Sequence, residues 1–207
     1  MAKGFGMKRD TSIVTVLFCL GNLCWAQGED KSLGEWANAQ KEAAFVNMMK
    51  NISPPGTLRG VVVASPSKEN PNYFYHWVRD AALIMDVVVT QYSKPMSATE
   101  KAVFFDRMDG YVDFSRSNQT TSTPSGGPGE PKYNVDGTPF AEPWGRPQND
   151  GPALRAITLI HFANELLKEG KDSYVLQKLY NGALRSVDTV IKFDLEFVSH
   201  RWRDTCF

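Results

Sequence analysis

The segment "RDAALIMDVVVTQY", residues 79–92, constrains the fold most strongly, because after its charged start it is apolar almost all round. Only Asp86, Thr90 and Gln91 would present polar atoms to water if the segment were helical. A helix that lacks a polar face is usually surrounded by other elements of the protein. We therefore expect residues 79–92 to form a helix of an inner layer, with further helices packed around it.

Capping boxes of the form Ser-x-x-Glu open two further helices. Ser32 and Glu35 stand before an apolar periodic segment that ends near Lys50, and Ser97 and Glu100 stand before another. The segment after Ser97 has apolar residues at helical spacing, and this amphipathic pattern is typical of an outer layer packed on an inner one. The sequence thus predicts helices at residues 32–50 and from residue 97 onward.

Two more helices are predicted in the C-terminal half of the chain. One begins near Asp150, tolerates a proline in its first turn and ends at Gly170, which fits a C-terminal cap. The other begins near Ser173 and continues, with a kink at Gly182, to the end of the chain. Helices joined by short connections, apolar inside and amphipathic outside, predict an all-α layered architecture.

Residues 119–149 separate these helices and have no periodic pattern, because they are rich in Gly, Pro, Ser and Thr. A loop of this length inside a compact domain is usually functional or disordered. Its first half, "TTSTPSGGPG", looks like a flexible linker, whereas its second half carries aromatic residues and Arg146, which pure linkers lack. Before the inner helix, "RGVVVASPS" predicts a short extended segment, since it is rich in valine.

The first 26 residues have the pattern of a secretory signal peptide. Lys3, Lys8 and Arg9 form a positive region, the apolar run "SIVTVLFCLGNL" follows, and a small residue precedes Gln27. The run is too short for a comfortable membrane span. We therefore expect a secreted, extracellular protein with no membrane association; the alternative is an uncleaved amphipathic anchor. Cleavage would leave Cys206 as a free thiol or as half of a disulfide bond.

Composition argues against several classes of function. Lys+Arg and Asp+Glu balance at 23 residues each, so no nucleic-acid partner is expected. The three histidines, His76, His161 and His200, lie far apart without metal-binding spacing, and no phosphate-binding glycine motif occurs. We therefore expect no metal and no cofactor, and we interpret His161 as a packing residue of a helix.

Two sequons predict N-glycosylation of a secreted chain. "NQT" at Asn118 lies beside the aperiodic segment, where a surface position is expected. "NIS" at Asn51 is followed directly by proline.

Aromatic, acidic and arginine side chains gather at two places, each just before an expected helix. They are Tyr73, Tyr75, Trp77, Arg79 and Asp80 in the first cluster, and Trp144, Arg146 and Asp150 in the second. A sugar ring has apolar faces that stack on aromatic rings and hydroxyls that bond to arginine and carboxylate. The alternatives are ordinary ones: one face of a core strand, a surface ion pair and a tryptophan that anchors a loop.

At these clusters the sequence resembles a known family. "GVVVASPSKENPNYFYHWVRDAAL" and "GEPKYNVDGTPFAEPWGRPQNDGPALRA" resemble two signature regions of secreted fungal glucoamylases, glycoside hydrolase family 15, and "WANAQKEAAFVNMMKNISPPG" resembles the family's opening helix. The likeness covers residues 27–207, which would be the N-terminal part of the catalytic domain. It implies a partial (α/α)6 barrel with roughly the first five helices. It also implies a monomeric, exo-acting, inverting hydrolase that releases β-D-glucose from the non-reducing ends of α-1,4-glucans such as starch.

The resemblance also implies roles for single residues. Arg79 and Asp80 match the pair that holds hydroxyls of the terminal glucosyl unit, while Tyr73 and Trp77 match aromatic residues that line the same subsite. Trp144 matches the tryptophan that packs near the scissile bond. Two further matches, Arg146 and Asp150, are expected to brace the loop and to cap the following helix.

Inversion requires two carboxyl groups, one acidic and one basic, on opposite sides of the bond. The family's acid lies in an Asp-Leu-Trp-Glu-Glu type segment that would begin directly after "HRWRDTCF", so both catalytic groups are expected beyond Phe207 and none within this chain. The similar "DLE" at 194–196 places Glu196 inside a helix, as a surface or packing residue. We expect the isolated chain to hydrolyse starch negligibly and to fold poorly, with its barrel open; the alternative is a non-catalytic, secreted, saccharide-binding remnant.

Overall fold

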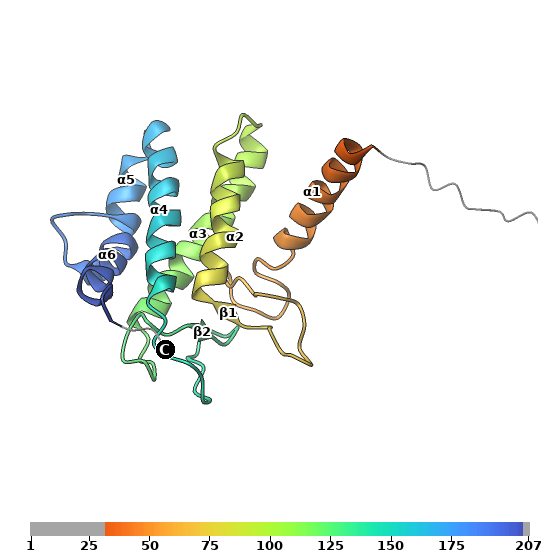
Figure 1. Ribbon diagram of the computed structural model, residues 1–207. Coiled ribbons are helices and arrows are strands. Elements are labelled where there is room, and N and C mark those ends of the chain that lie inside the picture. The colour runs from red at the N-terminus through yellow and green to blue at the C-terminus, as the bar shows by residue number, and fades with distance from the viewer. Residues whose placement is uncertain (1–31, 205–207) are drawn as a thin grey trace, which may run out of the picture. The chain divides into compact units, whose positions relative to one another are not determined.

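The computed structural model describes residues 32–204, so the expected signal peptide at 1–26 and Cys206 lie outside the described residues. As predicted, this part of the chain is all-α apart from two short strands (Figure 1). The chain divides into compact units between Ala39 and Gln40, and the unit from Gln40 onward holds every element after α1. The elements are α1 (Leu33–Met49), β1 (His76–Trp77), α2 (Val78–Tyr92), α3 (Ala98–Thr120), β2 (Lys132–Tyr133), α4 (Asp150–Lys168), α5 (Asp172–Tyr174) and α6 (Val190–Arg201).

Both predicted capping boxes are present. The backbone N–H of Ser32 donates to the Glu35 carboxylate at 2.9 Å, and that of Ser97 donates to the Glu100 carboxylate at 3.0 Å. In each box the serine hydroxyl accepts the backbone N–H of the glutamate in return. These local bonds satisfy backbone donors that a helix start leaves open, which is why α1 and α3 begin where the sequence predicted.

The helices α2 and α4 lie side by side and run in the same direction. Arg79 contacts Asp150 near their first residues, and the Thr158 hydroxyl donates to the carbonyl of Ala82 further along. Between them and α3 lies the hydrophobic core, which includes Ala81, Met85, Val88, Tyr92, Met108, Tyr111, Leu159 and Phe162. The apolar segment at 79–92 is therefore an inner helix, as predicted.

Another face of α2 is not covered by the described residues. Leu83 is 54% exposed and Val87 is 38% exposed, although both are apolar.

His161 of α4 does not pack in the interior as predicted. Its ring is half exposed, and Nδ1 lies 2.8 Å from a carboxylate oxygen of Asp86. The interpretation of His161 as a packing residue was wrong because its place on α4 faces the open side between the two helices rather than the core.

The predicted fifth helix is broken. After the single turn α5, residues Val175–Leu179 form a π-helical turn, and Tyr180 is extended with φ −152° and ψ 127°. A 3-10 turn follows at Ser186–Asp188, and α6 starts only at Val190. The prediction of one continuous helix failed because Asn181 and Gly182 favour a turn over a helix interior.

The segment at 121–149 connects α3 to α4 and contains β2. Residues 128–133 are buried; of these, Pro128 and Gly129 end the half that looked like a linker, and residues 130–133 belong to the second half. The Glu130 side chain is fully buried and accepts a hydrogen bond from the Ser125 hydroxyl at 2.9 Å. Tertiary hydrogen bonds and packing thus hold a backbone that has no periodic pattern of its own. None of the helices within residues 32–204 is long and apolar enough to cross a membrane.

Candidate functional site

The two predicted clusters meet at the starts of α2 and α4. Strand β1 pairs with β2 in antiparallel register, so that Trp77 lies opposite Lys132 and His76 lies opposite Tyr133. Figure 1 shows this small sheet beside the first turns of α2 and α4. The helices come close there because Gly151 has no side chain: a Cβ at this position would lie 3.0 Å from Cγ1 of Val78. The strand pair thus brings together Trp77 and Lys132, which are 55 positions apart, and the close helix contact brings together Arg79 and Asp150, which are 71 positions apart.

Five rings form a surface that we call the aromatic wall. It consists of Tyr73, Tyr75, Trp77, Phe140 and Trp144. Trp77 and Trp144 are nearly perpendicular with ring centroids 5.3 Å apart, and Tyr73 lies 6.4 Å from Trp77. Phe140 lies 5.2 Å from Tyr75 and 6.4 Å from Trp144. Tyr73 and Trp144 are 44% and 45% exposed, whereas Trp77 is buried at 8%, so the wall is open to its surroundings at Tyr73 and Trp144.

Arg79 lies in the first turn of α2, two residues after Trp77 of the aromatic wall. Its Nη1 donates to a carboxylate oxygen of Asp150 at 2.7 Å, whereas Nε is 3.9 Å from Asp80. The hydrogen bond to Asp150, more than the neighbouring negative charges, raises the pKa of Arg79. The Asp80 side chain is 43% exposed, and this long contact is its ion pair within residues 32–204. Asp80 therefore keeps a carboxylate that can accept hydrogen bonds from a ligand.

The position of Asp150 corrects one prediction. The N-cap residue of α4 is Asn149, and no side chain forms a cap hydrogen bond there. Asp150 instead belongs to the first turn of the helix, and its carboxylate is used by Arg79. The capping role of Asp150 was expected from its match to a family position; its pairing with Arg79 on another helix is visible only in three dimensions.

Arg146 braces the loop, as predicted. Its Nε donates to both carboxylate oxygens of the buried Glu130, at 3.0 and 3.1 Å. The remaining nitrogens donate to backbone carbonyls of Phe140 and Glu142. These bonds fix the backbone that carries Phe140 and Trp144, since loop carbonyls with no helix or sheet partner must find donors elsewhere.

Lys132 is the residue that sequence reasoning missed. It is 3% exposed, and its ammonium nitrogen lies 3.7 Å from the ring centroid of Phe140 and 3.8 Å from that of Trp144. Tyr75 and Trp77 complete the enclosure at 4.6 and 4.8 Å. Burial lowers the pKa of this lysine, and the nearby Arg146 charge adds to the effect. One signal was available: a lone lysine within a segment of aromatic and proline residues, "EPKYNVDGTPF".

Two other predicted positions belong to the interior and not to a site. The Asn118 side chain is buried in α3 and 1% exposed, so the sequon prediction fails there: an amide nitrogen without access to solvent cannot carry a glycan in this fold. Asp194, which resembles the start of the acid motif, is fully buried and pairs with Arg155 at 2.6 Å. Glu196 is half exposed on α6, as predicted.

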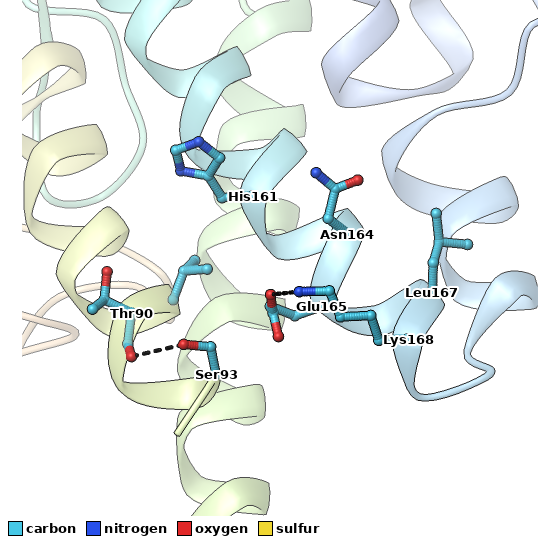
Figure 2. Close-up of a pocket in the computed structure, with 8 residues that line it drawn as sticks. Thr90, Ser93, His161, Asn164, Glu165, Leu167 and Lys168 are labelled. Atoms are coloured by element: carbon cyan, nitrogen blue, oxygen red, sulfur yellow. Dashed lines mark hydrogen bonds and ion pairs between the residues drawn. The ribbon is translucent and has the colours of Figure 1, made fainter. Parts of the chain in front are cut away.

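A separate groove between α2 and α4 has a volume of about 520 Å³ (Figure 2). It lies toward the C-terminal halves of both helices, whereas the aromatic wall lies at their starts. Thr90 and Ser93 border it on α2, and His161, Glu165 and Lys168 border it on α4. No aromatic ring other than the imidazole lines it, so it offers no stacking surface for a sugar. Within the described residues there is also no cluster of His, Cys, Asp or Glu that could hold a metal ion.

The helical arrangement matches that of known (α/α)6 barrel proteins. A solved glucoamylase structure from Hormoconis resinae is 36% identical with a TM-score of 0.75, and the match covers 85% of this chain and 30% of that one. The chain thus has part of an (α/α)6 fold. Residues 38–207 match Glycosyl hydrolases family 15, and the chain belongs to that family.

Among its relatives, Glucoamylase-1 of Schizophyllum commune is 38% identical over 93% of this chain and 33% of the relative. A glucoamylase of Saccharomyces cerevisiae named as intracellular and sporulation-specific is 34% identical over 86% of this chain and 34% of the relative. The chain therefore spans about a third of the length of the curated relatives it matches.

Proposed function

We propose that residues 27–207 provide the substrate-holding half of a secreted glucoamylase. The whole enzyme would act from the non-reducing ends of α-1,4-glucans and release β-D-glucose with inversion. The catalytic acid and base would come from segments beyond Phe207, so the 207-residue chain would bind saccharide but not hydrolyse it. Family membership supports the reaction class, since the relatives carry the name glucoamylase.

One observation carries the proposal: an aromatic wall that is exposed at Tyr73 and Trp144 stands next to an arginine with a carboxylate on each side. Tyr73 and Trp144 offer faces on which a pyranose ring can stack. Arg79 has further N–H groups beyond the one given to Asp150, and Asp80 has an exposed carboxylate. Donors and an acceptor beside an apolar face are the complement of a sugar with hydroxyls around an apolar ring. We place the terminal glucosyl unit on Tyr73, Trp77, Arg79, Asp80 and Trp144.

Binding is tested with maltotriose and the purified 207-residue chain, under conditions where circular dichroism shows it folded. Arg79→Met is expected to weaken binding by about tenfold or more, because a hydrogen bond from a charged group contributes ~1.5–3 kcal/mol. Arg185→Met is the matched control, since that arginine is 80% exposed and, among the residues the structure describes, pairs with Asp188 three residues away. Equal affinities for wild type and Arg79→Met would contradict the proposed site.

Hydrolysis is tested separately by glucose release from maltotriose. The 207-residue chain is expected to release no glucose above the buffer rate, because it lacks both proposed catalytic groups. Release at the rate of an intact glucoamylase would overturn the assignment of the acid and base to later segments. That result would not change the conclusion of the binding experiment.

The second candidate is a non-catalytic, secreted, saccharide-binding protein that retains this half-site. The half exposure of Leu83 and Val87 is compatible with either candidate. Sequencing the transcript past the codon of Phe207 separates them: an acidic Asp-Leu-Trp-Glu-Glu type segment there supports the enzyme, and a stop codon supports the binding protein.

Secretion, a monomeric state and glycosylation at Asn51 remain proposals of their own. Because one relative is named as intracellular, secretion requires direct measurement. Expression with the native N-terminus should deliver the protein to the culture medium cleaved before Gln27. Recovery of the uncleaved chain in the cell would contradict this prediction.

A further inference from the structure

The environment of Lys132 is unusual for a lysine. Its ammonium group makes no hydrogen bond and no ion pair within residues 32–204, although the residue is 3% exposed. An ammonium ion is strongly hydrated, and its removal from water is costly unless other groups replace the water. Four ring faces lie between 3.7 and 4.8 Å from the ammonium nitrogen, which is the geometry of a cation–π interaction, and they replace part of its water shell.

The ammonium lies between the rings of the loop and the rings of the strand side. Phe140 and Trp144 lie on a loop that has no regular structure between Tyr133 and Asp150 apart from an isolated bridge at Pro139. Arg146 holds backbone carbonyls of this loop, and its side-chain hydrogen bonds within residues 32–204 go to those carbonyls and to Glu130. Trp144 is 45% exposed, so packing alone confines it only on one side. Lys132 is the group that touches both loop rings and both rings from the strand side, Tyr75 and Trp77.

We propose that Lys132 is a positioning residue of the saccharide site, whose positive charge holds Phe140 and Trp144 of the loop against Trp77 of β1. The wall then has its stacking geometry only while the ammonium is charged. The structural part of this inference stands on ring distances alone. Its consequence for saccharide affinity rests on the proposed function.

The charged neighbours define how the wall responds to pH. Arg146 and Glu130 face the lysine from the loop, and Tyr75 is the titratable ring of the enclosure. Burial and the Arg146 charge lower the pKa of Lys132, while Glu130 opposes them. Glu130 is itself neutralised by Arg146 at 3.0 Å. The lysine therefore loses its proton at a lower pH than an ordinary lysine, and the wall should loosen below the usual lysine range.

The nearly perpendicular tryptophan pair provides a direct readout. Two indoles 5.3 Å apart couple their transitions and give an exciton couplet in circular dichroism. Trp144→Phe lacks one indole of the pair, so its circular dichroism spectrum gives the baseline without the couplet. Lys132→Met, which keeps length but not charge, is expected to remove most of the couplet, and Lys132→Arg, which keeps charge, is expected to retain most of it. An unchanged couplet in Lys132→Met would overturn the inference.

A pH titration keeps the test decisive if Lys132→Met fails to fold. The wild-type couplet should fall with rising pH while the helical signal stays constant, and Lys132→Arg should show no such fall, because arginine does not lose its proton. Identical titrations of the two proteins would refute a role for the lysine charge.

Affinity for maltotriose links the wall to function. Lys132→Met is expected to bind about tenfold more weakly than wild type, while Lys132→Arg remains within about threefold. Loss of the couplet without loss of affinity would refute the role of Lys132 in the saccharide site. Absence of maltotriose binding by the wild type would count against the proposed function alone, since the couplet is measured without saccharide.

Discussion

The buried pair of Arg155 and Asp194 supports a quantitative prediction about stability. Nε and Nη2 of Arg155 donate to the two carboxylate oxygens at 2.7 and 2.6 Å, and Nε2 of Gln119 donates to one of them at 2.8 Å. The two side chains are 2% and 0% exposed. The pair joins α4 to α6, and Gln119 adds the end of α3. Asp194 lies where the sequence begins like an acid motif, and the prediction tests its structural role.

Asp194→Asn keeps the shape of the side chain but leaves the guanidinium charge buried without its counter-charge. Burial acts to lower the pKa of Arg155, but Asp194 outweighs this and raises it; arginine stays charged in any case, so the variant cannot relieve the cost by losing a proton. Loss of one partner from a buried ion pair costs about 3–5 kcal/mol. That is a large part of the ~5–15 kcal/mol of a typical domain.

The assay is urea unfolding, monitored by far-UV circular dichroism. If the wild type is only marginally stable, trimethylamine N-oxide is added at the same concentration to all variants. Glu196→Gln is the control on the same helix. Its side chain is 49% exposed and 3.9 Å from Lys192, so a change below about 0.5 kcal/mol is expected. Arg155→Met combined with Asp194→Asn should cost less than the sum of the single changes, because no charge remains buried. A loss below about 1 kcal/mol for Asp194→Asn, or strict additivity, would refute the reasoning.

Three further predictions follow from single positions. Gly60→Ala should destabilise the fold by about 3 kcal/mol in urea melts, because φ is +87° and a Cβ would lie 1.9 Å from the carbonyl oxygen of Gly110. Gly56→Ala is the control: its φ is +84° with open space around it, so it should cost only about 1 kcal/mol. Equal losses of stability in the two variants would contradict this prediction. Burial raises the pKa of Glu169, but hydrogen bonds from two lysines and a tyrosine outweigh it and lower the pKa from 4.5 to about 2. The contribution of the ionised Glu169 to the stability of the fold is therefore present above about pH 4.5 and lost as the pH falls toward 2. In thermal melts, Glu169→Gln should reduce the dependence of the melting temperature on pH in this range. An unchanged dependence would contradict the prediction. Asn118→Gln should leave the gel mobility of the secreted protein unchanged, since the wild-type side chain is buried; an increased mobility would show that a glycan was attached there.

The features predicted from sequence are those with local or periodic causes. The Ser32–Glu35 and Ser97–Glu100 boxes set two helix starts through bonds within one turn, and such bonds need no other part of the chain. The apolar run at 79–92 required burial and became the inner helix α2. The two signature regions identified the family, because they preserve long, specific strings of residues.

Tertiary structure explains part of what the sequence did not predict. The fifth helix breaks at Asn181 and Gly182, which favour a turn, but the extended backbone at Tyr180 is visible only in the structure. Burial of Asn118 depends on neighbours that include Tyr133, whose hydroxyl donates to the carbonyl of Asn118 at 3.1 Å. A sequon pattern contains no information on such neighbours.

The candidate site shows the same division. The sequence by itself determined which side chains are available: aromatic rings, Arg79, Asp80 and the helices that follow them. Only the tertiary structure decided their partners, because the β1–β2 pairing sets Lys132 opposite Trp77 and the close contact at Gly151 brings Asp150 to Arg79. Residue types follow from the chain, but a charge enclosed by four rings requires segments that meet only after folding.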